Sequence, residues 1–500
     1  MDHDGTIAII GGGPAGACLA ALLSRRGFSV DVYEKRADPR PTSAAPSTAA
    51  AAAAAPASPF GQAADAAKRS INLALSHRGL AALDALSLRP AALAAAVPMP
   101  CRAIHPSAGG APVAQAYGQP GQAIHSISRG FINALLLDAC EAAPAPGASG
   151  AARLHFGVSL AALAEDGLLT LRAEPGAPAP APPPYRPRLV VGADGAFSAV
   201  RGAMMRWTRM DFARRFIPHG YKELRLPPAP GAGGAPSFAL PLPHALHIWP
   251  RGAFMLIALP NADLSFTCTL FAPFATFAEL DAGGAGSVRA FFSAQFGDVA
   301  GALPDVAAQW AANPTSPLME VRCAPWQHAR RALLLGDAAH STVPFYGQGM
   351  NAALEDCLCL AEAVDAEVAA AAGGGGEGDT LERAVAAFAA RRQPAGIALC
   401  DLSMGNYEEM REHTASPLFR ARLAVERLLH WAAPTWWVPQ YSLVAFSRVP
   451  YDEVVAVVAR QDAAAARVVA WGGAALGLAL GLWAAGGPAG VRKALARALA

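Results

Sequence analysis

Three glycines near the start of the chain have the spacing of a nucleotide-binding turn. Gly11, Gly13 and Gly16 follow an apolar run at 6–10 and precede a helical pattern, which is the context that gives this spacing its meaning. The first glycine allows a tight turn, the second lets the backbone approach a pyrophosphate, and the third lets the helix pack closely on the strand. The free N–H groups at the start of that helix would bind the anion.

An acidic residue stands where such a turn needs one. Glu34 ends the next apolar run, 18 residues beyond Gly16. A carboxylate in this position accepts hydrogen bonds from the hydroxyl groups of a ribose. A purely structural glycine turn is the alternative, and the register of strand, helix and acid favours a nucleotide.

A Gly-Asp motif in the second half of the chain favours a flavin. The apolar run 332–335 is followed by Gly336 and Asp337, and a glycine turn at 347–349 then opens a helix. A carboxylate at such a strand end can hold the ribityl chain of a flavin, and the start of the new helix can face the pyrimidine side of its ring. The helix dipole would stabilise the negative charge that this edge gains on reduction. An N-cap role is the alternative for Asp337.

The elements that must position these motifs alternate between strand and helix. Strands are predicted at 6–10, 28–33, 189–191 and 332–335, with a helix from 14 to 26 between the first two. The third of these strands leads into an Asp-Gly motif, Asp194 and Gly195, for which a plain turn is the alternative. Further β-rich segments at 247–249, 254–258 and 264–271 indicate a separate region, and helix predominates after Leu381, interrupted by Pro434 and Pro439. The pattern predicts an α/β fold.

Composition limits the class of protein. A chain of 500 residues is too long for one ordinary core, so two or three packed domains are expected. Hydrophobic residues make up 53% and charged residues 16%, which excludes wholesale disorder, and a net charge of +2 gives no case for a nucleic-acid partner. The eight cysteines form no CxxC pair, so neither a disulfide framework nor a zinc site is predicted, and a reducing compartment is favoured.

Three stretches have the composition of insertions. Residues 42–67 include an Ala/Ser/Pro-rich run, residues 175–187 are rich in Pro and Ala, and residues 371–378 are rich in Gly. Each has too little large apolar surface to offset the entropy of ordering it, so each is predicted to be a loop or linker.

The end of the chain predicts a membrane anchor at 466–491. From Val468 to Val491 there are 24 residues without a charge, bounded by Arg467 and Arg492. A helix of that length would span about 36 Å, enough for a hydrocarbon core of about 30 Å. The run Gly486–Pro488 would break such a helix, and an apolar helix docked on the protein or on a partner is the alternative.

The three nucleotide motifs, in this order, resemble those of the single-component flavin-dependent aromatic hydroxylases, for which p-hydroxybenzoate hydroxylase is the fold model. Within that group the chain is similar to the kynurenine 3-monooxygenase family. The strings that carry this resemblance lie at 69–76 (RSINLALS), 217–221 (IPHGY), 247–251 (HIWPR), 265–270 (SFTCTL) and 401–404 (DLSM). The resemblance extends from Ala8 to about Tyr451, apart from the three insertions.

The resemblance implies a Rossmann-like FAD-binding domain with a β-sheet substrate domain, followed by a C-terminal helical region and the membrane helix. The FAD-binding domain is expected in three parts, at 1–100, 126–205 and 323–395, and the substrate domain at 101–125 and 206–322, with the helical region at 396–462.

It also implies tightly bound FAD and NADPH as co-substrate, although no second dinucleotide fingerprint appears in the sequence. The residues expected at FAD are Gly11, Gly13, Gly16, Glu34, Ala74, Arg129, Leu160, Asp194, Asp337, Gly349, Met350 and Asn351. Arg129 is expected to be buried there, with an exposed arginine at a helix start as the alternative.

The resemblance further implies an aromatic substrate that is a zwitterion. An arginine suits its carboxylate because the guanidinium is planar and bidentate, and by resemblance that residue is Arg102. The other expected substrate residues are Tyr117, Asn406, Glu409, Tyr441, Phe345 and Tyr346. No side chain is expected to act as a catalytic acid or base, and His340 is assigned a packing role.

The implied reaction is hydroxylation of L-kynurenine to 3-hydroxy-L-kynurenine with NADPH and O₂ through a flavin C4a-hydroperoxide, in tryptophan degradation and NAD biosynthesis. The implied location is the outer mitochondrial membrane, with the catalytic part facing the cytosol. Two alternatives remain at this stage, namely a flavin hydroxylase of another aromatic acid and a non-catalytic, membrane-anchored flavoprotein.

Overall fold

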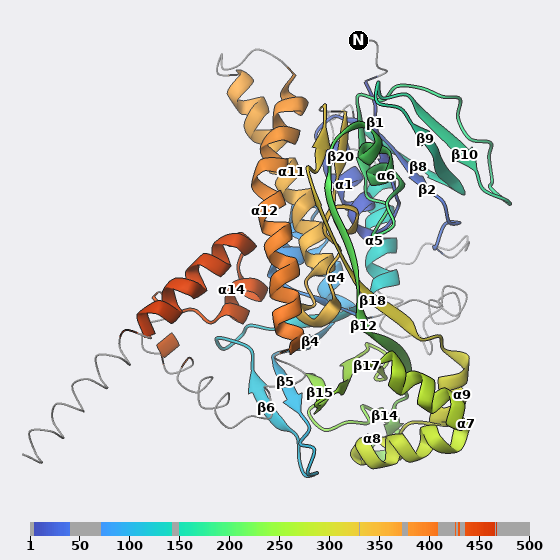
Figure 1. Cartoon of the computed structure of the whole chain (residues 1–500), viewed down its shortest axis with the longest axis vertical. Helices are drawn as coiled ribbons and strands as arrows, with labels where there is room; N and C mark the ends of the chain where they lie inside the picture. Colours follow the sequence, from blue (N-terminus) through green and yellow to red (C-terminus); the bar gives the residue numbers. More distant parts are fainter. Residues whose placement is uncertain are drawn as a thin grey trace, which may run out of the picture.

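A mixed sheet of six strands forms the centre of one half of the molecule, called the first half below (Figure 1). The computed structural model describes residues 5–40, 72–142, 150–329, 331–372, 379–408, 426, 429–430, 436–465 and 467. The strand order is β19-β20-β11-β1-β2-β8, parallel except for the β19–β20 edge pair. These strands are β1 (Ile7–Ile10), β2 (Ser29–Glu34), β8 (Ala151–Phe156), β11 (Leu189–Gly192), β19 (Gln327–His328) and β20 (Ala332–Leu334). β1, β11 and β20 are buried along their whole length, which explains why they read as continuous apolar runs.

Helices cover this sheet and close its core. α1 (Pro14–Ser24) connects β1 to β2 and packs against α5 (Arg129–Glu141) and α11 (Gly349–Ala372). The remaining helices of this half are α3 (His77–Ala85), α4 (Arg89–Ala94), α6 (Ala199–Trp207) and α10 (Asp337–His340), with the 3₁₀ turn η3 (Pro344–Tyr346). It also contains a three-stranded sheet of β3 (Asn72–Leu75), β7 (Ile124–Ser128) and β4 (Val97–Met99), and a hairpin of β9 (Val158–Leu163) and β10 (Leu169–Ala173).

A second sheet of seven strands forms the other half, in the order β18-β12-β17-β16-β15-β5-β6. Its strands are β5 (Cys101–Ile104), β6 (Val113–Ala116), β12 (Asp211–Leu226), β15 (Ala245–Arg251), β16 (Phe254–Pro260), β17 (Phe266–Pro273) and β18 (Ser316–Ala324). The helices α7 (Phe274–Gln295), α8 (Gly297–Ala300) and α9 (Val306–Ala312) share a core with this sheet that includes Trp249, Phe292 and Trp310. The small elements β13 (Ala229–Pro230), η2 (Ala232–Gly234) and β14 (Pro236–Ser237) lie in the β12–β15 connection. The long strands β12 and β18 run between the two halves in Figure 1.

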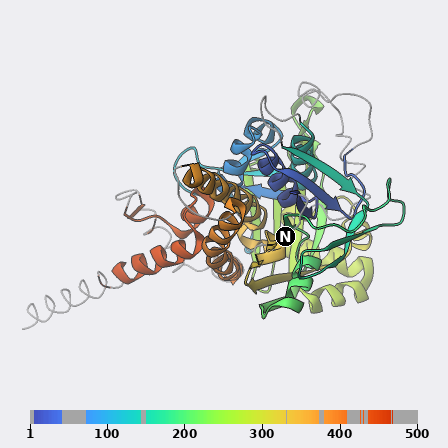
Figure 2. The same cartoon turned by 90° about the horizontal axis from the view of Figure 1, so that it is seen from above.

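The C-terminal part is helical and lies against the first half. α12 (Thr380–Glu408) packs along α11, and α14 (Gln440–Phe446) contacts α3. A further helix over 451–465 follows, and Figures 1 and 2 show these last helices projecting to one side of the molecule. Pro439 stands directly before α14, at one of the positions where the sequence predicted an interruption of the C-terminal helical region.

The predicted α/β fold is confirmed, and the strands expected at all three nucleotide motifs are present. Residues 175–187 follow an irregular path, with one isolated bridge between Leu169 and Tyr185. The insertions at 42–67 and 373–378 lie outside the described residues, as does the predicted membrane anchor apart from Arg467. Within the described part of the chain, no helix is both long and apolar enough to cross a bilayer. The domain boundaries remain predictions.

A buried histidine in the second sheet makes stability depend on pH. His247 is fully buried between the imidazole of His105, at 2.9 Å, and the carbonyl of Leu242, at 3.3 Å. Burial, together with the neighbouring His105, lowers the pKa of His247 from 6.5 to about 4. The unfolded chain therefore binds more protons than the folded protein between these pH values, so stability falls as pH decreases through this window.

We expect His247→Gln to flatten this dependence. The wild type should lose up to about 3 kcal/mol of stability from this group between pH 6.5 and 4, and the variant should not. Thermal unfolding followed by circular dichroism at pH 5 and pH 7 measures the difference, with the exposed His244→Gln as control. An equal pH dependence of the melting temperature in His247→Gln and wild type would contradict the assignment.

Candidate active site

The glycine turn after β1 requires glycine at two of its positions. Gly11 has φ +109°, and a Cβ atom there would lie 2.4 Å from the carbonyl oxygen of Ala193. A Cβ atom at Gly16 would lie 1.9 Å from the carbonyl oxygen of Gly11. Gly13 differs, because a Cβ atom there meets no protein atom within 4 Å. Gly13 therefore leaves open space at the N-cap of α1, where the backbone can approach an anion.

Glu34 fixes this turn from the end of β2. Its carboxylate accepts hydrogen bonds from the N–H of Gly12, at 2.9 Å, and from the guanidinium of Arg36, at 2.7 Å. Burial alone would raise the pKa of Glu34, but Arg36 and the backbone donors outweigh it and hold the pKa below its usual value. Glu34 is therefore an ionised carboxylate beside the glycine turn, as a ribose acceptor must be.

The Gly-Asp motif lies beside the same turn. Gly336 has φ +59°, and a Cβ atom there would lie 3.5 Å from Ala15 of α1 and 3.1 Å from Ala353 of α11. The next residue, Asp337, begins α10 and has an exposed side chain. The close approach at Gly336 places the backbone of the Gly-Asp motif beside the first turn of α1.

The Asp-Gly motif contains a buried carboxylate oxygen. Oδ2 of Asp194 accepts hydrogen bonds from the N–H groups of Ala199, at 2.6 Å, and Val200, at 3.3 Å, at the start of α6. Its Oδ1 is buried and has no hydrogen-bond partner among the described residues. Burial raises the pKa of Asp194. A ligand hydroxyl would satisfy the remaining oxygen.

Arg201 connects the Asp-Gly motif to the Gly-Asp motif, and it was not predicted from the sequence. Its guanidinium donates to the carbonyl of Ala196 and to that of Ala338 in α10, both at 2.6 Å. The side chain is almost fully buried. An arginine three residues beyond a helix N-cap looks like a surface residue in the sequence, so no local signal marked it.

The start of α11 is the fourth element of this candidate cofactor site. Gly347 adopts the left-handed conformation, with φ +63°, and α11 then begins at Gly349, followed by the half-buried Met350. Asn351 is fully buried. Its amide donates to the carbonyls of Ala74 and Gly347, each at 2.8 Å. Asn351 thus clamps the end of β3 onto the turn before α11.

Two further residues expected at the cofactor are Arg129 and Leu160. Arg129 is exposed at the first position of α5, and its expected contact with the flavin nucleotide stays a prediction. The Ser128 side chain caps this helix by accepting from the N–H of Phe131, and the first helical side chain is exposed. Leu160 lies half-buried in β9, which contacts β2.

These residues fit FAD. The open N-cap at Gly13, the ionised Glu34 and the unsatisfied oxygen of Asp194 supply complements for a pyrophosphate, a ribose and a further hydroxyl. The exposed Asp337 and the start of α11 supply a carboxylate and a helix N-terminus on the side of Gly336.

The predicted substrate residues gather around Arg102 of β5. Its guanidinium lies 4.5 Å from the ring centre of Tyr441 and 5.3 Å from that of Tyr117. The rings of Tyr117 and Tyr441 stack at 4.9 Å, and Tyr346 stacks on Tyr441 at 5.7 Å. Burial raises the pKa of Tyr117 and that of Tyr441, so both hydroxyl groups remain proton donors at neutral pH.

The aromatic residues at η3 connect this cluster to the start of α11. Phe345 stacks on Tyr407 at 4.1 Å, and the amide of Asn406 donates to the carbonyl of Phe345 at 2.7 Å. Tyr346 is the next residue and reaches Tyr441 from the same turn. Glu409 lies outside the described residues. The structure thus brings together all the predicted substrate residues that it describes.

The surroundings of His340 bear on its predicted packing role. His340 is buried, stacks on Trp326 with ring centres 5.0 Å apart, and contacts the carboxylate of Asp356 at 2.6 Å. This environment agrees with its predicted packing role. Among the described residues there is also no cluster of side chains that could hold a metal ion.

Comparisons with known proteins agree with this geometry. A family described as an NAD(P)-binding Rossmann-like domain matches residues 9–47, and one described as an FAD binding domain matches residues 304–393. The kynurenine 3-monooxygenase of Salinispora arenicola is 39% identical over 95% of this chain and 94% of its own, and that of Sus scrofa is 39% identical over 90% and 86%.

Among solved structures, PqsL of Pseudomonas aeruginosa in complex with 2-aminobenzoylacetate has a TM-score of 0.59 at 20% identity, covering 81% of this chain and 97% of its own. The 2-methyl-3-hydroxypyridine-5-carboxylic acid oxygenase has a TM-score of 0.58 at 19% identity, covering 82% and 94%. At these identities the two structures establish the fold alone.

Fold and site together define an FAD-dependent monooxygenase that also uses a nicotinamide cofactor. Sequence identity over nearly the whole chain identifies the family within this class. The chain belongs to the kynurenine 3-monooxygenase family.

Two glycine variants should separate the scaffold from the cofactor contact. Gly16→Ala forces a methyl group against the Gly11 carbonyl, so it should lower the melting temperature of the apoprotein, at a cost of about 1–3 kcal/mol. Gly13→Ala meets no protein atom and should leave that temperature unchanged while weakening FAD binding about 10-fold, because its methyl group occupies the path of the pyrophosphate. Calorimetry of the apoprotein and a flavin-fluorescence titration provide the two readouts, and wild-type FAD affinity in Gly13→Ala would refute the placement.

Proposed function

We propose that this protein hydroxylates L-kynurenine to 3-hydroxy-L-kynurenine with NADPH and O₂. The observation that carries the proposal is the Arg102 guanidinium, which packs against the stacked rings of Tyr117 and Tyr441. Tyr346 continues this row of aromatic rings toward the start of α11. Kynurenine carries an α-amino acid at one end and an aromatic amine at the other, which matches a cation at one end of a row of aromatic side chains.

The amino-acid end of the substrate is assigned to Arg102 and its tyrosine neighbours. The guanidinium would bind the carboxylate in a bidentate pair, which is strong where water is excluded. The hydroxyl groups of Tyr117 and Tyr441 stay protonated because burial raises the pKa of each, so they can donate hydrogen bonds to the same carboxylate.

The aromatic end is assigned to the turn at Phe345 and Tyr346. These two buried rings lie directly before the helix that faces the flavin position, so they set the distance and orientation between the substrate ring and the cofactor. Bound FAD supplies the redox and oxygen-transfer chemistry. The protein's part is to align the substrate and to exclude water, because oxygen transfer competes with loss of reducing equivalents to solvent.

A hydroxylase of another aromatic acid is the alternative. Product identification separates the two directly. The FAD-loaded protein is incubated with NADPH, air and kynurenine, and mass spectrometry should find a product one oxygen atom heavier than kynurenine, with NADPH oxidation stimulated by the substrate. Unstimulated NADPH oxidation with no heavier product would overturn the proposal, and NADH in place of NADPH tests the choice of reductant.

Replacement of Arg102 should affect substrate binding selectively. We expect Arg102→Ala to raise the KM for kynurenine about 10- to 100-fold, the loss of one charged hydrogen-bonding group, while FAD content stays at the wild-type level. Arg102→Lys should recover only part of the loss because lysine is not bidentate. Arg225→Ala, which removes an exposed arginine paired with Asp263, is the control. An unchanged KM in Arg102→Ala would defeat the assignment.

We further propose that the tail at 466–491 anchors the enzyme in a membrane, with the catalytic part on the cytosolic side of the outer mitochondrial membrane. The support is the run of 24 uncharged residues between Arg467 and Arg492. Removal of all residues after Gln461 should move the protein from the membrane pellet to the supernatant with its flavin still bound. A truncated protein that still pellets with membranes would refute the role of the tail.

A further inference from the structure

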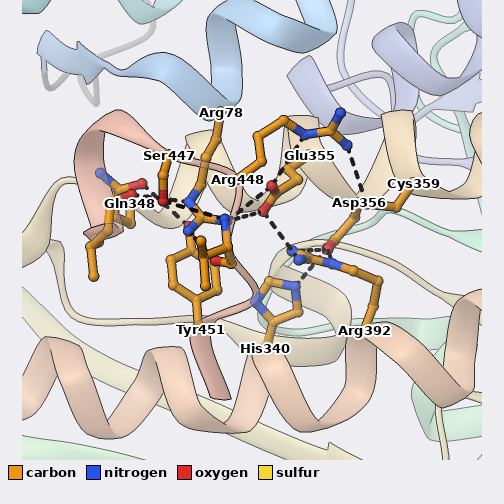
Figure 3. Close-up of polar contacts among 12 residues, drawn as sticks. Arg78, His340, Gln348, Glu355, Asp356, Cys359, Arg392, Ser447, Arg448 and Tyr451 are labelled. Atoms are coloured by element: carbon orange, nitrogen blue, oxygen red, sulfur yellow. Dashed lines mark hydrogen bonds and ion pairs between the residues drawn. The ribbon is translucent and has the colours of Figure 1, made fainter. Parts of the chain in front are cut away.

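Two consecutive carboxylates are buried in the middle of α11. Glu355 is 1% exposed and Asp356 is 0% exposed, in a stretch of the helix whose other residues are apolar or small. A buried charge is tolerated only where opposite charges and hydrogen bonds satisfy it. Figure 3 shows the arginines that do so, which come from three different parts of the chain.

Arg78 of α3 connects Glu355 to the C-terminal segment. Its guanidinium pairs with Glu355 at 2.8 Å and is itself fully buried. It also donates to the carbonyls of Val444, at 3.0 Å, and Val449, at 2.5 Å, and lies 4.0 Å from the ring centre of Tyr451. One side chain therefore fixes both the end of α14 and the turn that follows it.

Arg392 of α12 extends these ion pairs from Glu355 to Asp356, close to the Gly-Asp motif. The series Arg78, Glu355, Arg392 and Asp356 is called the ionic chain below. It pairs with Glu355 at 3.1 Å and with Asp356 at 2.8 Å. Asp356 in turn accepts from the N–H of Gly336, at 3.2 Å, directly before the cofactor residue Asp337. Burial would raise the pKa of Asp356, but His340 and Arg392 outweigh it and lower the pKa, so the carboxylate stays ionised.

The segment that Arg78 holds carries a substrate residue. Tyr441 lies in the first turn of α14, and the carbonyl of Val444 at the other end of this short helix is the one that Arg78 binds. The position of the Tyr441 ring over Arg102 therefore depends on Arg78, whose contacts within the described part of the chain include none of the predicted substrate or cofactor side chains.

We propose that Arg78 is a positioning residue for the cluster of proposed substrate residues around Arg102. It holds α14 so that Tyr441 closes over Arg102, and through Glu355, Arg392 and Asp356 it shares one ionic chain with the Gly336 turn. This inference rests on the proposed function for its substrate. It goes beyond that function in assigning the order of the C-terminal segment to a residue of α3.

Arginine is specifically required at this position. A planar guanidinium presents five donors in a fixed arrangement, so it can bind a carboxylate and several carbonyls at once, while it stacks on an aromatic ring. Lysine keeps the charge and can pair with Glu355, but its single ammonium group cannot reach Glu355, Val444 and Val449 together. Arg78→Lys thus loosens the segment without leaving Glu355 unpaired.

The test compares Arg78→Lys with wild type in the full chain loaded with FAD. The KM for kynurenine should rise about 10-fold with a smaller change in kcat, and FAD affinity should stay within about 2-fold. Without substrate, peptides covering 440–451 should exchange amide hydrogen faster than in wild type. The control is Arg188→Lys, which alters a partly buried arginine–carboxylate pair with Asp379 in the first half of the fold and should change neither readout.

A second variant avoids any change of buried charge. Tyr451→Leu removes the ring beneath the Arg78 guanidinium and should shift both readouts in the same direction. Unchanged KM and unchanged exchange at 440–451 in both variants would overturn the proposal, as would a uniform loss of FAD, stability and kcat at constant KM. A wild-type protein that does not act on kynurenine would refute the proposed function instead, while the exchange measurement would still decide the role of Arg78.

Discussion

The adjacent carboxylates of Glu355 and Asp356 impose the strongest physical constraint in this molecule. Two neighbouring negative charges inside a protein repel each other and lose their hydration, so they persist only where cations surround them. The cations come from α3, α12 and the C-terminal segment, in the form of Arg78, Arg392 and Arg448. Parts of the chain hundreds of residues apart must therefore meet on α11 for the charges to be satisfied.

That meeting point explains how the cluster of predicted substrate residues can be built from separate parts. α11 starts at the turn that follows Phe345 and Tyr346, and the second sheet contributes Arg102. α14 contributes Tyr441, which reaches both Arg102 and Tyr346. No single element contains the site. An enzyme that must exclude water during oxygen transfer would gain from this arrangement, because the cluster needs residues from several elements at once.

The sequence predicted best what depends on local spacing. The β1 glycine turn, the strand before Gly336 and the acid at Glu34 follow from residues close together in the chain, and each is where the pattern placed it. The substrate residues were different, because no local pattern marks Arg102 or Tyr441 as partners. They came from the family resemblance, and the structure adds that their side chains are in contact.

What the sequence could not predict depends on contacts between distant segments. Arg129 was expected to be buried and is exposed, because the capped start of α5 leaves its first side chain at the surface. The ionic chain went unnoticed as well, although two acids within an apolar helical stretch were a usable signal, since such residues are rarely buried without partners. Their partners, Arg78 and Arg392, are separated from them by 277 and 36 residues, so only the folded structure identifies them.

A crystal structure of the full chain with FAD and kynurenine would test the account most directly. The account predicts that the kynurenine carboxylate pairs with the Arg102 guanidinium under the Tyr441 ring, and that the substrate ring lies between Phe345 and a flavin whose pyrimidine edge faces the start of α11. A substrate bound in the opposite direction, or a carboxylate held by a different residue with Arg102 turned away, would contradict it.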